Sequence, residues 1–351
     1  MKKAKSQIEN RIERHSKLVF VALTIVFVIV FIVSLGIGKY MVSANQVINI
    51  IIGKIFRSPI TASPSAVIVV MNIRLPRLIA AVMVGGALSA AGATYQGLFR
   101  NPIVSPDLLG ASAGAGFGAA IALMFSLNLL WVSLSAFITG ICAVFLAYSI
   151  STIISRGNDA LLTLVLTGMV VSSLFTAFTS LVKFVADPNS KLPAITFWLM
   201  GGLSSIVPQS LLLMLVPLLI GIIPLFIFRW RINLMSFGDE EAQSMGLDIK
   251  KYRIGFIFCA TLLTAASVAV SGMIGWVGLV IPHISRMIVG PNYKKLLPAS
   301  LIVGATFLII VDDLARCAFS SEIPLSIITS IIGAPFFVIL MLKGRRVGSD
   351  A

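Results

Sequence analysis

Two adjacent carboxylates in a long apolar stretch are the groups in this chain with the clearest capacity for chemistry. Asp312 and Asp313 directly follow an uncharged run from Leu296 to Val311. A carboxylate inside a bilayer costs roughly 2.5–3.5 kcal/mol on insertion scales, so such a residue is a functional candidate. One interpretation is a proton relay. The simpler one, which we favour, is an ion pair between Asp312 and Arg316, one helical turn later.

A short acidic segment, Gly238–Gly246, has the pattern of a small amphipathic helix. A Gly-Asp pair can cap the helix, and two glutamates then favour the positive end of its dipole. Two apolar residues fall on one face at helical spacing, and a glycine can end the helix. Such a helix either lies on lipid or docks into a protein groove, and its acids favour the groove. The residues concerned are Gly238, Asp239, Glu240, Glu241, Ala242, Met245 and Gly246.

The common catalytic and ligand-binding patterns do not occur in the sequence. The two Gly-Lys pairs, at Gly38 and Gly53, lack the Ser or Thr that a phosphate-binding loop needs. The three cysteines are far apart, and two histidines cannot form a metal site by themselves. We therefore expect no catalytic residue, no metal site and no cofactor bound by this chain.

Composition identifies the environment that these residues must work in. Of the 351 residues, 58% are hydrophobic and 11% charged, against about 45–50% and 25% in soluble domains. The mean hydropathy is +1.03. So few charges cannot cover a water-soluble surface, which predicts a polytopic membrane protein and excludes a soluble enzyme. The net charge of +14 is expected for cytoplasmic loops near anionic lipid, so we do not expect nucleic-acid binding.

The uncharged runs predict an all-α protein with ten transmembrane helices, because about 20 apolar residues cross a bilayer. The run 108–155 holds two spans with a break near 126–133, and 254–285 holds two more with irregular backbone around Pro282. A short helix is expected at 194–200. The remaining spans are 18–38, 78–99, 160–182, one from about 209, one from 296, and 323–342.

Charge asymmetry sets the orientation. Ten spans put both termini on one side, and that side carries nineteen of the 27 lysines and arginines. Positive-inside asymmetry then places both termini in the cytoplasm. The predicted organisation is a cytoplasmic N-terminal segment 1–17, a permease domain 18–343 with a cytoplasmic loop 229–253, and a tail 344–351. No loop is long enough to fold as a domain, so a solute-capturing or ATP-hydrolysing domain must be a separate chain.

Three arginines lie on the external face under this topology. Arg74 and Arg77 open the second span, and Arg316 closes the ninth. Positive-inside asymmetry disfavours cations there. They either snorkel or pair with nearby acids, or they form a basic docking surface for acidic groups of an external partner.

Two features concern how the spans pack and open. Glycines recur at helical spacing in the second and third spans, including Gly85, Gly92 and Gly114. Such residues let helices approach closely in lipid. A tight cytoplasmic turn, Asn101-Pro102-Ile103, joins these spans and is a candidate gate.

Taken together, these residues resemble the FecCD-like permease family, the iron-siderophore, haem and cobalamin permeases of binding-protein-dependent ABC importers. The similarity runs from about residue 70 to 343. The matching strings are Arg74–Arg77, Gln96–Pro102, Pro106–Gly110, Gly238–Gly246, Gly275–His283, Leu297–Ala299 and Gly333–Phe337.

The resemblance implies a type II importer permease in the bacterial cytoplasmic membrane. Its implied partners are a second permease subunit, two cytoplasmic ATPase subunits that hold ATP and Mg²⁺, and an external substrate-binding protein. It implies ATPase coupling through Gly238–Gly246, docking of the binding protein on Arg74, Arg77 and Arg316, and an inner gate at Asn101, Pro102 and Ile103. The doubled acid Asp312-Asp313 departs from the single Asp of many members.

We therefore expect a pore-forming subunit that moves a bulky iron chelate, such as a siderophore, haem or cobalamin, by alternating access. ATP hydrolysis belongs to the separate subunits, so the chain itself is not an enzyme. The alternative is a proton-coupled secondary transporter that uses Asp312 and Asp313.

Overall fold

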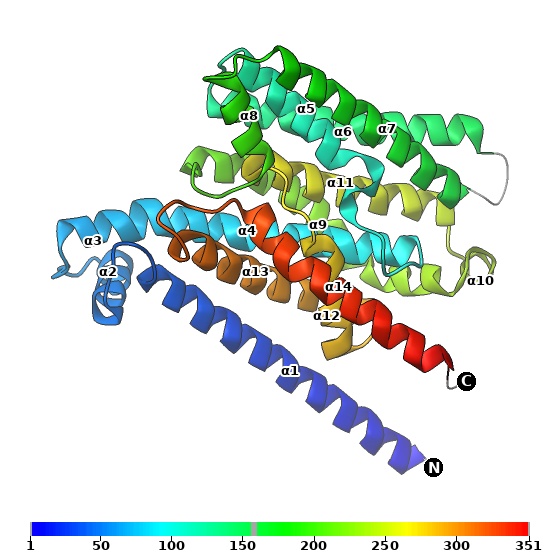
Figure 1. Cartoon of the computed structure of the whole chain (residues 1–351). Helices are drawn as coiled ribbons and strands as arrows, with labels where there is room; N and C mark the ends of the chain where they lie inside the picture. Colours follow the sequence, from blue (N-terminus) through cyan, green and yellow to red (C-terminus); the bar gives the residue numbers. More distant parts are fainter. Residues whose placement is uncertain (1, 156–159, 350–351) are drawn as a thin grey trace.

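The computed structural model describes the backbone of residues 2–155 and 160–349, in which every regular element is a helix (Figure 1). Residues 1 and 350–351, parts of the predicted terminal segments, lie outside the described residues. The elements are α1 (Lys2–Gly36), α2 (Ala44–Phe56), α3 (Pro64–Ile68), the π-helix η1 (Val69–Arg74), α4 (Leu75–Leu98), the 3₁₀ helix η2 (Pro106–Leu109), α5 (Ala111–Met124), α6 (Leu129–Ile154), α7 (Ala160–Val185), α8 (Lys191–Leu199), α9 (Pro208–Phe237), α10 (Asp239–Ser244), α11 (Ile249–Ser271), α12 (Val277–Val289), α13 (Tyr293–Cys317) and α14 (Leu325–Ser349).

The helices confirm the predicted all-α, multi-span fold. Within the described residues, seven helical stretches are long and apolar enough to cross a membrane, and they belong to α1, α3–α4, α6, α7, α9, α11 and α13. The shorter apolar helices α5, α12 and α14 occupy the three remaining predicted spans. The two chain ends lie at the same end of the bundle (Figure 1), as an even number of crossings requires.

Several helices extend beyond the uncharged runs, and the second and sixth predicted spans show why. The second span begins at Pro64, because Ser63 caps the helix there and Pro64 suits its first turn. Pro76 then lacks a backbone N–H, and the helix widens to a π-helix just before it. At the inner end, α9 continues to Phe237, so the predicted loop 229–253 shortens to α10 and its flanks.

The expectation of irregular backbone around Pro282 is wrong in position. Pro282 lies inside α12, and the non-helical backbone is the segment between Ser271 and Val277. A positive φ at Gly272, and at Trp276 as well, turns the chain there. Pro282 is tolerated because it leaves only the carbonyl of Gly278 without its helical donor.

Helix α4 is the central element and is buried over nearly its whole length. Two of its glycines meet glycines of neighbouring helices. A Cβ added to Gly92 would overlap the carbonyl of Gly278 on α12, and one added to Gly85 would overlap that of Gly304 on α13. Backbones in direct contact leave no room for a side chain. Because α4 and α13 are held together in this way, residues at their outer ends are brought side by side.

Candidate functional site

A buried ion-pair cluster lies at the outer ends of α4 and α13. Asp312 is fully buried, and its carboxylate accepts two hydrogen bonds from Nε of Arg77, at 2.9 and 3.0 Å. Nε of Arg316 lies 3.1 Å from the other side of the same carboxylate. The favoured pairing of Asp312 with Arg316 is therefore confirmed, and Arg77 joins it from another span.

Two further carboxylates complete the neutralisation of these arginines. Glu322, in the segment after α13, accepts hydrogen bonds from Nη1 of Arg77 at 2.9 and 3.1 Å. Asp313 pairs with Nη2 of Arg316 and accepts a 2.5 Å hydrogen bond from the hydroxyl of Ser34 on α1. The cluster thus joins α1, α4, α13 and the outer loop.

Arg74 is held differently, by backbone oxygens. Its Nη1 donates to the carbonyl of Leu35 at 2.6 Å, and its Nη2 donates to the carbonyl of Tyr40. The guanidinium packs against Gly38, whose missing side chain leaves the space that it fills. Arg74 therefore fixes the end of α1 and the turn that follows.

The three arginines predicted to dock an external partner are buried in this structure, and the docking role itself stays a prediction. Arg74, Arg77 and Arg316 are only 3%, 6% and 6% exposed. Three arginines and three carboxylates, Asp312, Asp313 and Glu322, make the cluster neutral as a whole. A charged arginine is stable in the low-dielectric interior only when a carboxylate pairs with it, and such pairing leaves no net charge for a partner to bind.

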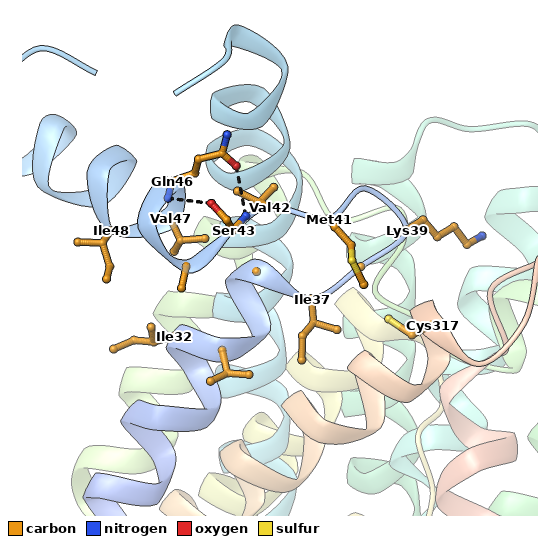
Figure 2. Close-up of a pocket in the computed structure, with 14 residues that line it drawn as sticks. Ile32, Ile37, Lys39, Met41, Val42, Ser43, Gln46, Val47, Ile48 and Cys317 are labelled. Carbon is orange, nitrogen blue, oxygen red and sulfur yellow. Dashed lines mark hydrogen bonds between the residues drawn. The ribbon is translucent and has the colours of Figure 1, made fainter. Parts of the chain in front are cut away.

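An apolar groove of about 960 Å³ lies beside the cluster, between the end of α1, the turn 37–43 and the start of α2. Figure 2 shows Ile32, Ile37 and Val47 lining it, with Cys317 of α13 at one side. The side chain of Ser43 caps α2, and that of Gln46 returns a bond to the Ser43 backbone. This capping box satisfies two backbone N–H groups at the start of α2.

At the inner face, α10 forms as predicted between two glycines. Gly238 has a φ of 138° and Gly246 a φ of 81°, values that L-residues rarely adopt. After the last turn, the N–H of Leu247 donates to the carbonyl of Ala242, which closes the helix end. Ala242 is buried and Met245 is 58% exposed, so the predicted common face of these two residues is wrong.

Asp239 anchors α10 to two neighbouring helices. Its carboxylate accepts from Nη2 of Arg253 on α11 at 2.8 Å and lies 3.9 Å from Nη2 of Arg100, just after α4. Glu240 and Glu241 remain exposed. The segment therefore presents acidic groups outward from a base that is tied to the ends of α4 and α11.

The predicted gate residues form an exposed turn at the same face. The side-chain oxygen of Asn101 accepts from the N–H of Ile103 at 2.9 Å, a local turn that fixes the geometry of Pro102 between them. Pro102 and Ile103 line a small cavity of about 20 Å³ with residues of α12 and α14, among them His283 and Phe336. The turn thus lies where three helices meet.

The family of the chain follows from its sequence as a whole. The model of the FecCD transport family matches residues 26–343, which is nearly all of the chain. The chain belongs to the FecCD transport family. The predicted resemblance is thereby confirmed, and the inner and outer groups described above lie within the matched region.

Individual relatives of this FecCD chain match over most of their length. It is 39% identical over 338 residues to the molybdate import system permease protein MolB of Haemophilus influenzae, covering 96% of this chain and 99% of that one. It is 40% identical over 281 residues to an iron chelatin transport system permease protein of Helicobacter pylori, covering 80% and 84%. A solved structure described as an inward-facing conformation of a metal-chelate type ABC transporter superposes with a TM-score of 0.83 at 39% identity, covering 93% and 99%.

Sequence reasoning missed several residues of this FecCD permease fold. Glu322 and Ser34 were not singled out, although an acid just beyond the ninth span was a detectable signal. A cluster of polar side chains at the inner end of the helix bundle was also missed. There Arg286 donates to Gln96 at 3.3 Å and to the hydroxyl of Tyr293 at 3.5 Å, which links α12 to α4 and α13.

Proposed function

We propose that the chain is the membrane-spanning subunit of an ATP-driven importer that takes a metal-containing solute into the cytoplasm. The family match and the end-to-end likeness to a metal-chelate type ABC transporter support this proposal. The observation that carries it is α10, a short acidic helix at the inner face that is anchored on two spans. An anchored helix transmits force, whereas a loose loop does not.

Cytoplasmic ATPase subunits, which bind ATP and Mg²⁺, dock on α10 in this proposal. The exposed surface there combines the carboxylates of Glu240 and Glu241 with the apolar side chains of Phe237 and Met245, which are 68% and 58% exposed. A mixed surface of this kind suits a protein groove. Movement of α10 then passes through Asp239 to α4 and α11, because its carboxylate faces arginines at the ends of both helices.

The inner turn Asn101–Ile103 is the proposed gate. It follows directly on α4 and is exposed, and Arg100 at its base faces Asp239 across 3.9 Å. A displacement of α10 therefore reaches the turn without passing through the apolar interior. A second permease subunit would complete the translocation path along the exposed faces of the spans.

The buried outer cluster has a structural role in this proposal. Arg77 and Arg316 hold the outer ends of α4 and α13 against Asp312, so an external binding protein meets a surface whose charges are already neutralised. The same pairing weighs against the proton-coupled alternative. The carboxylate of Asp312 is fully buried and has a guanidinium on either side, so no exposed route for a proton leads to it.

For the solute, an iron chelate is the first candidate and molybdate the second. The relative from Helicobacter pylori is described as an iron chelatin permease protein, which agrees with the expectation of an apolar path for a bulky chelate. Molybdate is favoured by the relative that matches along 96% of this chain. Both solutes are metal-containing and arrive through a binding protein in this scheme.

The test is uptake into proteoliposomes that hold the chain with its ATPase and binding-protein partners. A radiolabelled ferric siderophore and labelled molybdate are compared, each with ATP inside, without ATP, and with an uncoupler. We expect uptake of one solute that needs ATP and persists when the proton gradient is collapsed. Uptake that an uncoupler abolishes, or that proceeds with no ATPase present, would contradict the proposal.

A further inference from the structure

One guanidinium in the described part of the chain lies against three aromatic rings. The Cζ atom of Arg231, near the inner end of α9, lies 4.0 Å from the ring centroid of Tyr252 on α11. It lies 5.0 Å from that of Phe228 and 5.1 Å from that of Trp230. These contacts fix a planar cation with several N–H groups in one orientation.

Among the residues that the structure describes, no acid pairs with this cation. Nε of Arg231 is buried without a hydrogen-bond partner, and no ion pair joins Arg231 to an acid among the described residues. Asp248, which lies one helical turn before Tyr252, caps α11 by accepting a hydrogen bond from the N–H of Lys251 at 3.1 Å. By contrast, Arg77, Arg253 and Arg316 all have carboxylate partners. The anion site that Arg231 presents is therefore not filled by any described residue of this chain.

The position of Arg231 along α9 indicates where that anion lies. About 20 residues cross the hydrocarbon core, so a span that begins at Gln209 reaches the inner boundary near Phe228. Arg231 then lies about 4.5 Å beyond that boundary, at the level of lipid phosphates, at 1.5 Å per residue. On the same scale α10 starts about 12 Å further into the cytoplasm. Tyr252 and Trp230 are at the depth where interfacial aromatic residues gather.

The surface next to Arg231 is apolar and exposed. Ile220 and Ile227 are 51% and 60% exposed, and they precede Arg231 by eleven and four residues, so all three share one side of α9. Ile223 and Trp230, at 51% and 41%, widen this apolar stripe. An acyl chain that lies along the stripe ends with its headgroup at Arg231.

We propose that Arg231 binds the phosphate of an anionic phospholipid of the inner leaflet, with Tyr252 and Trp230 holding the guanidinium in place. The site fixes the inner end of α9 to the membrane, close to the segment that leads into α10. This inference does not depend on the transported solute or on the energy source.

The test uses the full-length chain in nanodiscs that contain phosphatidylglycerol and phosphatidylcholine in equal amounts and with the same acyl chains. After transfer to detergent, the lipids retained by the protein are counted by native mass spectrometry. We expect retained phosphatidylglycerol to exceed phosphatidylcholine and Arg231→Gln to reduce that ratio about five-fold, the effect expected for one interfacial cation. Arg14→Gln, which removes an exposed cation on the same side of the membrane, is the matched control and leaves the ratio unchanged.

Tyr252→Leu is a second variant, which keeps every charge and removes the closest ring. It lowers the same ratio if stacking orients Arg231, and it replaces Arg231→Gln should that variant fail to fold. An unchanged ratio in the folded variant, or an equal fall in Arg14→Gln, overturns the proposal. So does displacement of the lipid by excess inorganic phosphate, which identifies a free-anion site. A further result would also overturn the proposal. If Arg231→Gln no longer assembles with the ATPase subunits while its lipid ratio is unchanged, Arg231 binds a protein partner and not a lipid.

Discussion

The buried cluster at the outer face makes a sharp prediction for the substitution Asp312→Asn. The asparagine has nearly the same shape as the aspartate but carries no charge. The carboxylate of Asp312 is the group shared by Arg77 and Arg316, at 2.9 and 3.1 Å, and its side chain is fully buried. The change leaves these two guanidiniums with one carboxylate each, Glu322 and Asp313.

The expected cost follows from burial. Breaking a buried ion pair by removing one partner costs about 3–5 kcal/mol, because the remaining charge is uncompensated. The side chains of Arg77 and Arg316 are each only 8% exposed, so water cannot replace the lost carboxylate. Glu322→Gln is the matched control. Its side chain is 39% exposed, and the loss of such a partner costs about 1 kcal/mol or less.

The measurement is the free energy of unfolding in mixed micelles, titrated with denaturing detergent and followed by tryptophan fluorescence. The double variant Asp312→Leu with Arg316→Met removes one charge of each sign and keeps the cluster neutral. We expect its loss of unfolding free energy to be about 1–3 kcal/mol smaller than the sum of the losses in the single variants Asp312→Leu and Arg316→Met, as for residues in contact.

Two results would refute the reasoning. One is an Asp312→Asn protein within 1 kcal/mol of the original, which would mean that the guanidiniums do not need the carboxylate. The other is an equal loss in Glu322→Gln, which would mean that burial does not set the cost. Additivity of the double variant would show that Asp312 and Arg316 are energetically independent.

Two further predictions concern helix packing and the inner segment. Gly92→Ala destabilises the fold by about 1–3 kcal/mol, because its Cβ would overlap the backbone of Gly278; Gly255→Ala, which meets no atom within 4 Å, is neutral or slightly stabilising in the same unfolding titration. Asp239→Asn weakens the attachment of α10 to Arg253 and leaves the fold intact. In the assembled importer we expect ATP hydrolysis to continue while solute uptake per ATP falls at least several-fold. A parallel fall of hydrolysis and uptake, or an unchanged ratio of uptake to hydrolysis, would contradict the coupling role.

Much of the fold was predictable because it depends on local composition. A window of about 20 apolar residues is enough to specify a span, and the distribution of lysine and arginine is enough to orient it. The small helix α10 was also predictable, since the glycines that bound it and the acids of its first turn are adjacent in sequence. The start of the second span at Pro64 was missed. The predicted boundary was placed after Arg74 and Arg77, whereas the helix begins earlier, where Ser63 caps it.

The partners of the arginines were not predictable in the same way. Only Arg316 was matched correctly, since Asp312 lies one turn away on the same helix. Arg77 meets Asp312 and Glu322 across 235 and 245 residues of sequence. A list of residue types cannot distinguish a paired, buried arginine from a free one on a docking surface.

The sequence alone therefore determined that this is a ten-span membrane protein of the FecCD type, and it predicts that the acidic segment lies in the cytoplasm. Those properties follow from the free energy of moving each segment between water and lipid, which is additive along the chain. Only the tertiary structure decided which charges are neutralised and which are available. The reason is that an ion pair in low dielectric depends on a few ångströms between helices, and those distances are set by contacts such as Gly85 with Gly304.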